Sequence, residues 1–588
     1  MSSDLKGPFF TNTILLHIVV IWIFLFFYGE NNKKDHIQSD VVVYYGYVPA
    51  TFICKDITLK FLDKNKCQGR YWPLYLPNGN KVFKMSMGMA FLYTPFFFIG
   101  HLAASFLKEP QNGYSAPYQV ALAFGSFFYL ILGFHFLKKL LLVYFNDLIV
   151  GLVIIALFFG TNLFSYSTID FLMPHVYLFS LVSMVLYLTH KIVESPGWKR
   201  IGLLSFLLGL ISLIRPSNII LTLIPLLYGI RSFKELENRI RKIIRNKGYL
   251  LLGITAFIIP WIPQFIYWKV VTGQWLFYSY YDETFFFSSP HILEGLFGYR
   301  KGLFVYTPLL LFAFFGLFYL RKKVPDYFVP ILIFLPLFIY IVFSWWCWWY
   351  GGSFGQRPFI DIFPVLSIPL ACFIERITRI NYIKYVGLLL LEIFIGLNLF
   401  QTWQFKRCLI HYDSMSYETY WSAFLSLDFP KDWDGRLKHP DYLMAKLGNE
   451  DELDLNRLNK IDIQISLKAL NSKYVSCEIS STGELVANRD HDWDWEKFTI
   501  RKMSKDTFYL KAANNKFVYV NEDFGGKLEA TKTTVQEASV FNIHSYHRNE
   551  ISIKYKKNFV CLDPNDFKLK ASSEPVNSNS SFTVVTVK

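Results

Sequence analysis

Hydrophobic residues form long runs over the first two thirds of the chain and stop doing so near residue 403. Many of these runs reach the roughly 17–25 residues that a helix needs to cross a bilayer. They lie at 10–28, 84–106, 117–137, 141–163, 176–190, 201–214, 218–230, 249–271, 303–320, 327–345, 361–375 and 383–401. The pattern predicts a polytopic α-helical membrane region followed by a water-soluble part.

Basic residues in the short loops orient these runs, because cytoplasmic loops are enriched in Lys and Arg. The most basic loop is 231–247, and other basic pairs flank the remaining runs. All of them share one side only if 84–106 does not cross, so we expect that segment to be interfacial or re-entrant. The prediction is about eleven spans in the plasma (inner) membrane, with the N-terminus cytoplasmic and everything after 402 extracytoplasmic.

The water-soluble part repeats itself. Leu467–Val475 is matched by Leu510–Val518 and more weakly by Ile553–Val560, and Tyr474, Phe517 and Phe559 recur at spacings of 43 and 42 residues. A fixed period indicates one structural unit used several times. Its alternating residues, punctuated by Asn, Gly and Asp, predict β-strands.

Three such units resemble a β-trefoil of the fascin-like type. The predicted division is a membrane domain at 1–402, an extracytoplasmic linker at 403–460 and an all-β domain at 461–588. Trefoils serve many functions. Trp493 and Trp495 are candidates for a glycan-binding surface, although packing explains them equally well.

Composition narrows the function further. The chain has 588 residues, is 53% hydrophobic and carries a net charge of +15. Much of that charge lies in short loops between runs, so we do not expect a nucleic-acid partner. The seven cysteines form no CxxC, and no metal ligands are predicted. Cys54 and Cys67 share one outer loop, and both a disulfide and free thiols remain open.

The predicted topology gathers polar residues at the extracytoplasmic side. Charged groups within or beside a membrane are costly, and such a gathering indicates a functional site. The residues are Asp40, His175, Arg215, Arg300 and Arg357.

Individual roles follow from the chemistry of each side chain. Asp40 could deprotonate an acceptor hydroxyl, or it could belong to a helix N-cap. His175 could act as an acid, a base or a hydrogen-bond donor to phosphate, or lie in the interface. Arg357 follows an aromatic, glycine-rich segment, Trp345–Gln356, and its guanidinium matches phosphate oxygens. The alternative for that segment is an interfacial aromatic belt.

Motifs for nucleotide binding are missing from the sequence: we find neither GxGxxG nor a P-loop context. HExxH is missing too, and no GxSxG sequence lies in the strand–turn–helix context of a nucleophile elbow. If the chain makes glycosidic bonds, its sugar donor must therefore come from the membrane.

Three segments resemble the GT-C superfamily of membrane glycosyltransferases, and more narrowly the bacterial family 39, or dolichyl-phosphate-mannose-protein mannosyltransferase-like, proteins. They are the acidic loop around Asp40, the segment from Lys84 to Pro95, and Gly351–Arg357 before Asp361. The resemblance covers about residues 8–400. It implies a polyprenyl-phosphate sugar as donor, catalysis on the outer face, and Asp40 as catalytic base.

Tyr44, Tyr45 and Gln356, the neighbours of Asp40 and Arg357, complete the predicted substrate-binding set with His175, Arg215 and Arg300. The family has an adjacent acidic pair, whereas Val41 follows Asp40 here. This departure leaves dependence on a divalent metal open.

The leading prediction is therefore an enzyme that transfers a sugar to a glycan, lipid or protein acceptor. Its expected partners are the lipid bilayer, the lipid-linked donor and that acceptor. Two alternatives are a flippase for lipid-linked saccharides and a membrane anchor for a glycan-binding trefoil.

Overall fold

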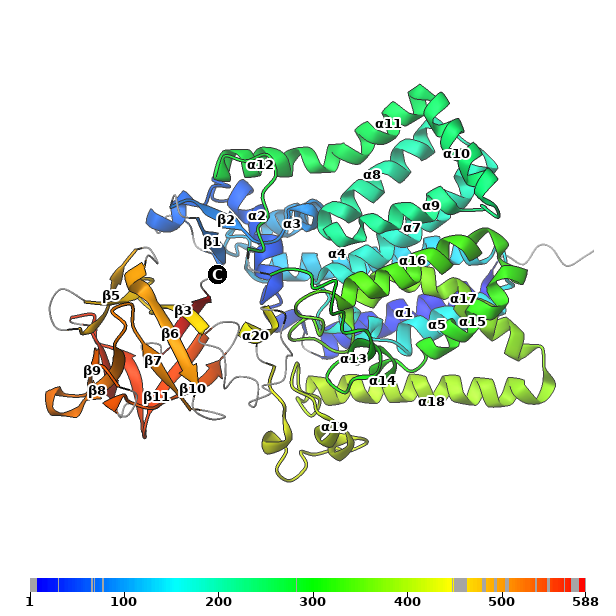
Figure 1. Ribbon diagram of the computed structural model, residues 1–588. Coiled ribbons are helices and arrows are strands. Elements are labelled where there is room, and N and C mark those ends of the chain that lie inside the picture. Colours follow the sequence, from blue (N-terminus) through cyan, green and yellow to red (C-terminus); the bar gives the residue numbers. More distant parts are fainter. Residues whose placement is uncertain are drawn as a thin grey trace, which may run out of the picture. The chain divides into compact units, whose positions relative to one another are not determined.

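The computed structural model divides the chain into two compact units, Met1–Lys438 and His439–Lys588. Figure 1 shows the first as a helical bundle and the second as a β-structure. The described residues are 8–29, 31–64, 67, 69–76, 79–281, 283–440, 442–446, 448, 463–478, 483–490, 494–502, 507–534, 537–546, 550–564, 566–572 and 581–586.

The first unit consists almost entirely of helices, apart from one small hairpin of β1 (Pro73–Tyr75) and β2 (Lys81–Phe83). Its helices are α1 (Phe9–Tyr28), α2 (Asp40–Phe52), α3 (Gly88–Leu107), α4 (Ala116–Leu141), α5 (Asp147–Phe159), α6 (Leu163–Thr168), α7 (Pro174–Glu194), α8 (Trp198–Ile214), α9 (Leu223–Leu227), α10 (Phe233–Arg245), α11 (Lys247–Ile258), α12 (Ile262–Thr272), α13 (Ile292–Phe297), α14 (Leu303–Tyr306), α15 (Leu310–Lys323), α16 (Pro325–Phe343), α17 (Phe363–Thr378), α18 (Asn381–Lys406) and α19 (Tyr417–Ala423).

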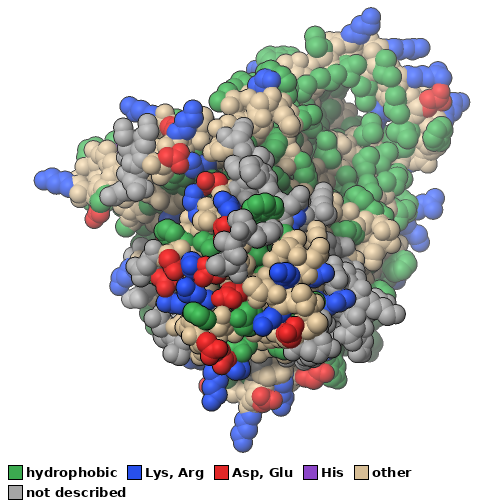
Figure 2. All heavy atoms as spheres, turned by 60° about the vertical axis from the view of Figure 1, so that its left-hand side comes forward, with side chains coloured by type: hydrophobic (Ala, Val, Ile, Leu, Met, Phe, Trp, Pro, Cys, Tyr) green, Lys and Arg blue, Asp and Glu red, His purple; other side chains and the backbone are tan. Residues whose placement is uncertain are grey.

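Eight helical segments in the described part of the chain are long and apolar enough to cross a membrane. They are Phe9–Tyr28, Gly88–Leu107, Ala116–Leu141, Pro174–Glu194, Lys247–Thr272, Pro325–Phe343, Arg357–Thr378 and Asn381–Lys406, with shorter apolar helices at Asp147–Phe159 and Pro216–Leu227. Figure 2 shows hydrophobic side chains over a broad part of the visible flank of this unit. These features are those of a membrane protein with several spans. The figure of about eleven spans stays a prediction.

Hydrogen bonds between segments distinguish the two ends of the bundle. At one end, the Asp147 carboxylate accepts from the Phe10 backbone N–H at 2.7 Å, so α1 begins where α5 begins. At the other end, Gln119 near the start of α4 donates to Asp35, just after α1, at 2.9 Å. The helices α1 and α4 therefore run antiparallel. We call these the Asp147 end and the Asp40 end.

Helix α3 contacts the Asp40 end at its first residue and packs against α4 farther along. Its first residue, Gly88, lies against Ile214, which immediately precedes Arg215. Farther along α3, a Cβ on Gly100 would lie 2.7 Å from the Tyr118 Cα at the start of α4, so the close approach requires glycine. By length and composition α3 could cross a membrane, and its interfacial or re-entrant placement stays a prediction.

A disulfide joins Cys54 and Cys67 in the segment that follows α2, with the two Cα atoms 5.7 Å apart. The sequence left the pairing of these residues open, and the structure makes them a pair. The disulfide ties the end of α2 to the loop that leads to β1.

The second unit is all-β, with a short helix, α20 (Tyr442–Lys446), before its strands. The strands are β3 (Ile463–Lys468), β4 (Tyr474–Cys477), β5 (Leu485–Arg489), β6 (Lys497–Lys502), β7 (Thr507–Lys511), β8 (Phe517–Asn521), β9 (Lys527–Lys532), β10 (Phe541–Tyr546), β11 (Glu550–Tyr555), β12 (Asn558–Leu562), β13 (Leu569–Ser572) and β14 (Ser581–Thr586). The antiparallel pairs β3–β6, β6–β7, β7–β10, β10–β11, β11–β14 and β14–β3 close a ring. The pairs β4–β5, β8–β9 and β12–β13 form hairpins.

The sequence repeat corresponds to a repeat of strand register. Lys468 pairs with Tyr474, Lys511 with Phe517, and Lys554 with Phe559, each across the first turn of its repeat. The recurrent Phe498, Phe541 and Phe582 are all fully buried in one core with Leu485, Leu528 and Leu569. Trp495 is 47% exposed, and Trp493 lies outside the described residues.

The structure groups residues up to Lys438 with the helices. Ile410, Met415 and Tyr420 form a buried cluster with Tyr306 and Phe354. Residues 403–438, assigned to the linker from the sequence, are thus part of the helical unit.

Candidate functional site

Asp40 is the first residue of α2, and its carboxylate accepts a hydrogen bond from Arg357 Nη2 at 3.2 Å. Both side chains are 13% exposed. A carboxylate in the first turn also stabilises the helix through the positive end of its dipole. The cap residue is Ser39, which makes no side-chain capping bond, so Asp40 itself is not the N-cap. The structure therefore brings together two of the predicted site residues.

The loop Trp345–Gln356, which we call the aromatic–glycine loop, immediately precedes Arg357 and places it beside Asp40. Three of its residues have positive φ angles: Tyr350 (56°), Gly351 (63°) and Gly355 (58°). Gly355 is also packed closely, since a Cβ there would lie 3.3 Å from the Tyr306 Cβ. Gln356 is 1% exposed and donates to the Trp348 carbonyl at 3.4 Å. The loop thus folds back on itself before the short 3-10 turn Arg357–Ile362 leads into α17.

A second cluster surrounds Asp361, which is fully buried. Its Oδ1 is 2.8 Å from His175 Nδ1. Its Oδ2 accepts from Arg215 Nη1 and from Asn218 Nδ2, both at 3.1 Å. A buried carboxylate needs such partners, because its desolvation is costly.

The sequence had placed His175 and Arg215 on one side but had missed Asp361 and Asn218. The signal for Asp361 was present, since an acidic residue at the start of a predicted span is unusual.

Tyr44 lies between the two clusters. Burial raises the pKa of its hydroxyl to about 12, while the charges of Arg215 and Asp40 act on it in opposite directions. The Arg215 guanidinium also lies 5.5 Å from the centre of the Tyr350 ring. Tyr44 is therefore within electrostatic reach of both clusters, and Tyr350 of the aromatic–glycine loop contacts Arg215.

Tyr45 points elsewhere. Its hydroxyl donates to the Gly113 carbonyl at 2.5 Å, and its ring packs edge-on against Tyr93 and Tyr114. The structure does not bring Tyr45 to the Asp40 and Asp361 clusters.

Arg300 is buried at a separate position, with its guanidinium 5.1 Å from the centre of the Trp349 ring. It also donates to the Lys438 carbonyl at 3.3 Å.

Its neighbour Lys301, which sequence reasoning passed over, is 1% exposed and donates to the carbonyls of Ser353 and Tyr412. Burial lowers the pKa of Lys301 to about 7. Lys301 therefore fixes the aromatic–glycine loop to the segment that follows α18.

A cavity of about 930 Å³ adjoins this loop. Its lining includes Phe405, Lys406, His411, Tyr412, Phe429 and Trp433. The Tyr412 carbonyl accepts from the Ser353 N–H at 3.0 Å. The wall of the cavity is thus hydrogen-bonded to the loop that carries Arg357.

Both clusters lie at the Asp40 end. The segment before His175 is held there, since Trp22 near the end of α1 donates to the Ser167 carbonyl at 2.7 Å. Asn31 donates to the next carbonyl, that of Thr168, at 3.2 Å. Among the described residues, no group of three or more His, Cys, Asp or Glu side chains could hold a metal ion.

Comparison with known proteins gives one family match, to a domain of unknown function (DUF7910), over residues 441–581. No curated protein matches the chain. Among solved structures, the designed threefold-symmetric protein ThreeFoil matches at 9% identity and a TM-score of 0.20, over 21% of this chain and 99% of that chain.

The S. cerevisiae protein O-mannosyltransferase Pmt1–Pmt2 complex, bound to its sugar donor, matches at 9% identity and a TM-score of 0.26. That match covers 99% of this chain and 64% of that chain. At such TM-scores neither structure carries an argument about the fold or function of this protein.

Proposed function

We propose that this protein is a membrane glycosyltransferase of the GT-C type, which transfers a sugar from a polyprenyl phosphate to an acceptor hydroxyl on the extracytoplasmic side. The observation that carries the proposal is the pairing of Asp40 with Arg357, 317 residues away in sequence. A carboxylate can serve as a general base. A guanidinium is the side chain that best matches phosphate oxygens. This sugar transfer needs both groups beside each other.

In the proposed reaction the acceptor oxygen attacks the anomeric carbon while Asp40 takes the proton of the acceptor hydroxyl. The bond between the anomeric carbon and the phosphate oxygen breaks, and its electron pair stays on the phosphate. Arg357 stabilises the charge that develops there. Because a guanidinium has five N–H donors, Arg357 can contact a phosphate while it holds Asp40.

Asp361 acts as a positioning residue in this proposal. It holds His175 and Arg215 through its two carboxylate oxygens. The Arg215 side chain is 19% exposed, and its guanidinium has donors beyond the one that binds Asp361. We assign that position to the lipid phosphate as well.

Two observations support an extracytoplasmic site. The disulfide between Cys54 and Cys67 is of a kind that persists in oxidising compartments. The basic helix α10 lies toward the Asp147 end, because its Arg239 donates to the Tyr228 carbonyl and the Tyr228 hydroxyl is 3.0 Å from that of Tyr144. The positive-inside pattern requires such a helix on the cytoplasmic side, and with it we propose eleven spans and a cytoplasmic N-terminus.

For the second unit we propose a β-trefoil. The closed ring of strands and the three hairpins support it, as does the shared register of the three repeats. A glycan is the proposed ligand, and the exposed Trp495 is the described aromatic side chain that we assign to that contact.

The test is to replace Asp40 with Asn and to measure sugar transfer in membranes that contain the full-length chain. Asn keeps the size and a hydrogen-bond acceptor but cannot take the proton. We expect transfer to fall by about 10²–10⁴-fold, which is the usual contribution of a general base.

Glu109→Gln is the matched control, because it removes an exposed carboxylate from the loop between α3 and α4. It should leave transfer unchanged. Undiminished transfer by a folded Asp40→Asn protein would rule out Asp40 as the base.

A further inference from the structure

Helix α10 has two opposite faces and no buried residue. Phe233, Ile240, Ile243 and Ile244 recur at helical spacing along one face and are 41–83% exposed. Lys234, Arg241, Lys242 and Arg245 follow the other face. Nothing in the described residues covers the apolar side.

The helix is nevertheless held in place. Arg239 on α10 donates to the Tyr228 carbonyl at 2.6 Å, after the end of α9. Ser232 caps the start of α10, and Asn246 caps the start of α11. The Gly229 N–H donates to the Asp326 carbonyl at 2.8 Å, which connects the segment before α10 to the start of α16. The two faces of α10 are therefore fixed relative to the bundle.

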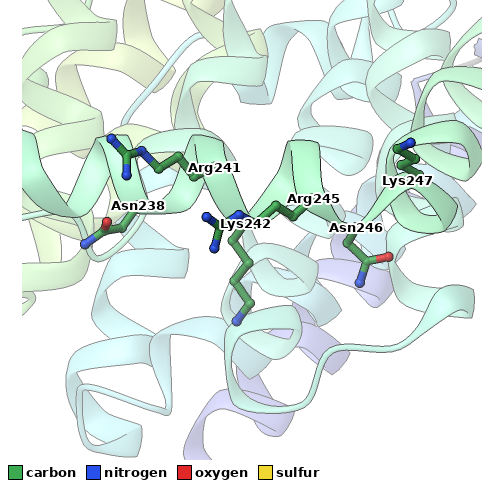
Figure 3. Close-up of a pocket in the computed structure, with 6 residues that line it drawn as sticks. All are labelled: Asn238, Arg241, Lys242, Arg245, Asn246 and Lys247. Carbon is green, nitrogen blue, oxygen red and sulfur yellow. The ribbon is translucent and has the colours of Figure 1, made fainter.

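Cationic side chains surround a cavity of about 520 Å³ where α10 meets α11. Figure 3 shows the six lining residues along these two helices: Asn238, Arg241, Lys242, Arg245, Asn246 and Lys247. Arg241 pairs with Glu237. Lys242, Arg245 and Lys247 make no ion pair with any described acidic residue. The cavity thus offers several positive charges and two amide side chains to an anion.

We propose that α10 lies in the headgroup layer of the membrane and that Lys242, Arg245 and Lys247 bind the phosphate of an anionic phospholipid. A lipid fits both faces, because its acyl chains can cover the exposed isoleucines while its headgroup meets the cations. A free anion would satisfy the cations alone. Each basic residue near an anionic surface adds to such binding. This site is at the opposite end of the bundle from Asp40 and does not depend on sugar transfer.

The experiment titrates the purified full-length protein in a neutral detergent with phosphatidylglycerol and counts bound lipid by native mass spectrometry. The triple variant Lys242→Gln, Arg245→Gln, Lys247→Gln should raise the apparent Kd at least about tenfold. Phosphatidylcholine should bind weakly to both proteins. Because the three side chains are exposed, the variant should keep the Tm of the parent.

The matched control is Lys139→Gln, Lys322→Gln, Lys384→Gln, which removes the same charge from the ends of α4, α15 and α18, all on the side with predicted cytoplasmic placement. It should change the Kd for phosphatidylglycerol by less than about twofold, since these residues lie outside the cavity. An equal loss in both triple variants would overturn the proposal. So would displacement of the lipid by millimolar inorganic phosphate, because that result would identify a site for free anions.

Discussion

Asp361 illustrates how a single buried side chain can organise several others. Its carboxylate holds a guanidinium, an imidazole and an amide in a fully buried position. Asp361→Asn removes the negative charge and leaves Arg215 facing an amide. We expect the free energy of unfolding to fall by about 3–5 kcal/mol, the usual cost of breaking a buried ion pair from one side.

Thermal unfolding of the purified protein in detergent measures this effect. Glu237→Gln is the control, because it breaks an exposed pair with Arg241. Such pairs contribute at most about 1 kcal/mol. A similar loss of stability in both variants would show that Asp361 has no special structural role.

Lys301 should make stability depend on pH. Its folded-state pKa is about 7, below its ordinary value of 10.5, because burial disfavours the charged amine. The stability that it contributes is therefore present above about pH 10.5 and is lost as the pH falls through about 7. For this single group, the free energy of unfolding cannot change by more than about 1.4 kcal/mol per pH unit.

Comparing thermal unfolding of Lys301→Met and the parent protein at pH 6 and pH 9 tests this. The Tm of the variant relative to that of the parent should rise as the pH is lowered, because Met cannot become charged. An unchanged difference in Tm between the two pH values would contradict the shifted pKa.

At the residue scale the sequence predicted a shared side for the candidate site residues but not the contacts between them. Asp40 and Arg357 were both expected at one face, but only the folded loop shows that they touch. Tyr45 was grouped with Tyr44 because they are adjacent in sequence. Consecutive residues of a helix point about 100° apart, so the side chains of Tyr44 and Tyr45 on α2 lie in different surroundings.

At the scale of elements, hydropathy located the runs but not their breaks. The run 249–271 is divided between α11 and α12, with Pro260 and Pro263 at the junction. The run 303–320 is divided between α14 and α15 around Pro308. Proline lacks the N–H that a continuous helix needs, yet one or two prolines barely lower the mean hydropathy of a long apolar run.

The β-elements were predicted more closely, because each repeat brings its own turn. Asn471 and Asn514 occupy equal positions in two repeats, and each donates to a backbone carbonyl at 2.8 Å, those of Ala487 and Ala530. Local turn chemistry of this kind is visible in a sequence. The pairing of β3 with β14 is not, since it joins segments more than a hundred residues apart.

At the scale of the whole molecule, the division at Lys438 makes a prediction about truncation. A chain ending at Lys438 retains the complete helical unit, and we expect it to keep sugar transfer in membranes. A chain ending at Thr402 loses Tyr412, whose carbonyl holds Lys301 and the aromatic–glycine loop. That shorter chain should lose transfer.

Both truncated chains are first tested for membrane insertion, so that failure to insert is not mistaken for loss of chemistry. Loss of transfer by an inserted chain that ends at Lys438 would favour the anchor hypothesis, in which the helices only carry the second unit. Retained transfer by the chain that ends at Thr402 would contradict the structural role of Tyr412.

The pairing of β3 with β14 has a practical consequence for protein engineering. Because Ile465 lies opposite Thr586 in that pair, the first and last strands of the second unit are neighbours. A short peptide could join them, and new termini could be opened in a hairpin turn without cutting a strand. The same proximity would let the unit be grafted into a surface loop of an unrelated carrier as a transferable cassette.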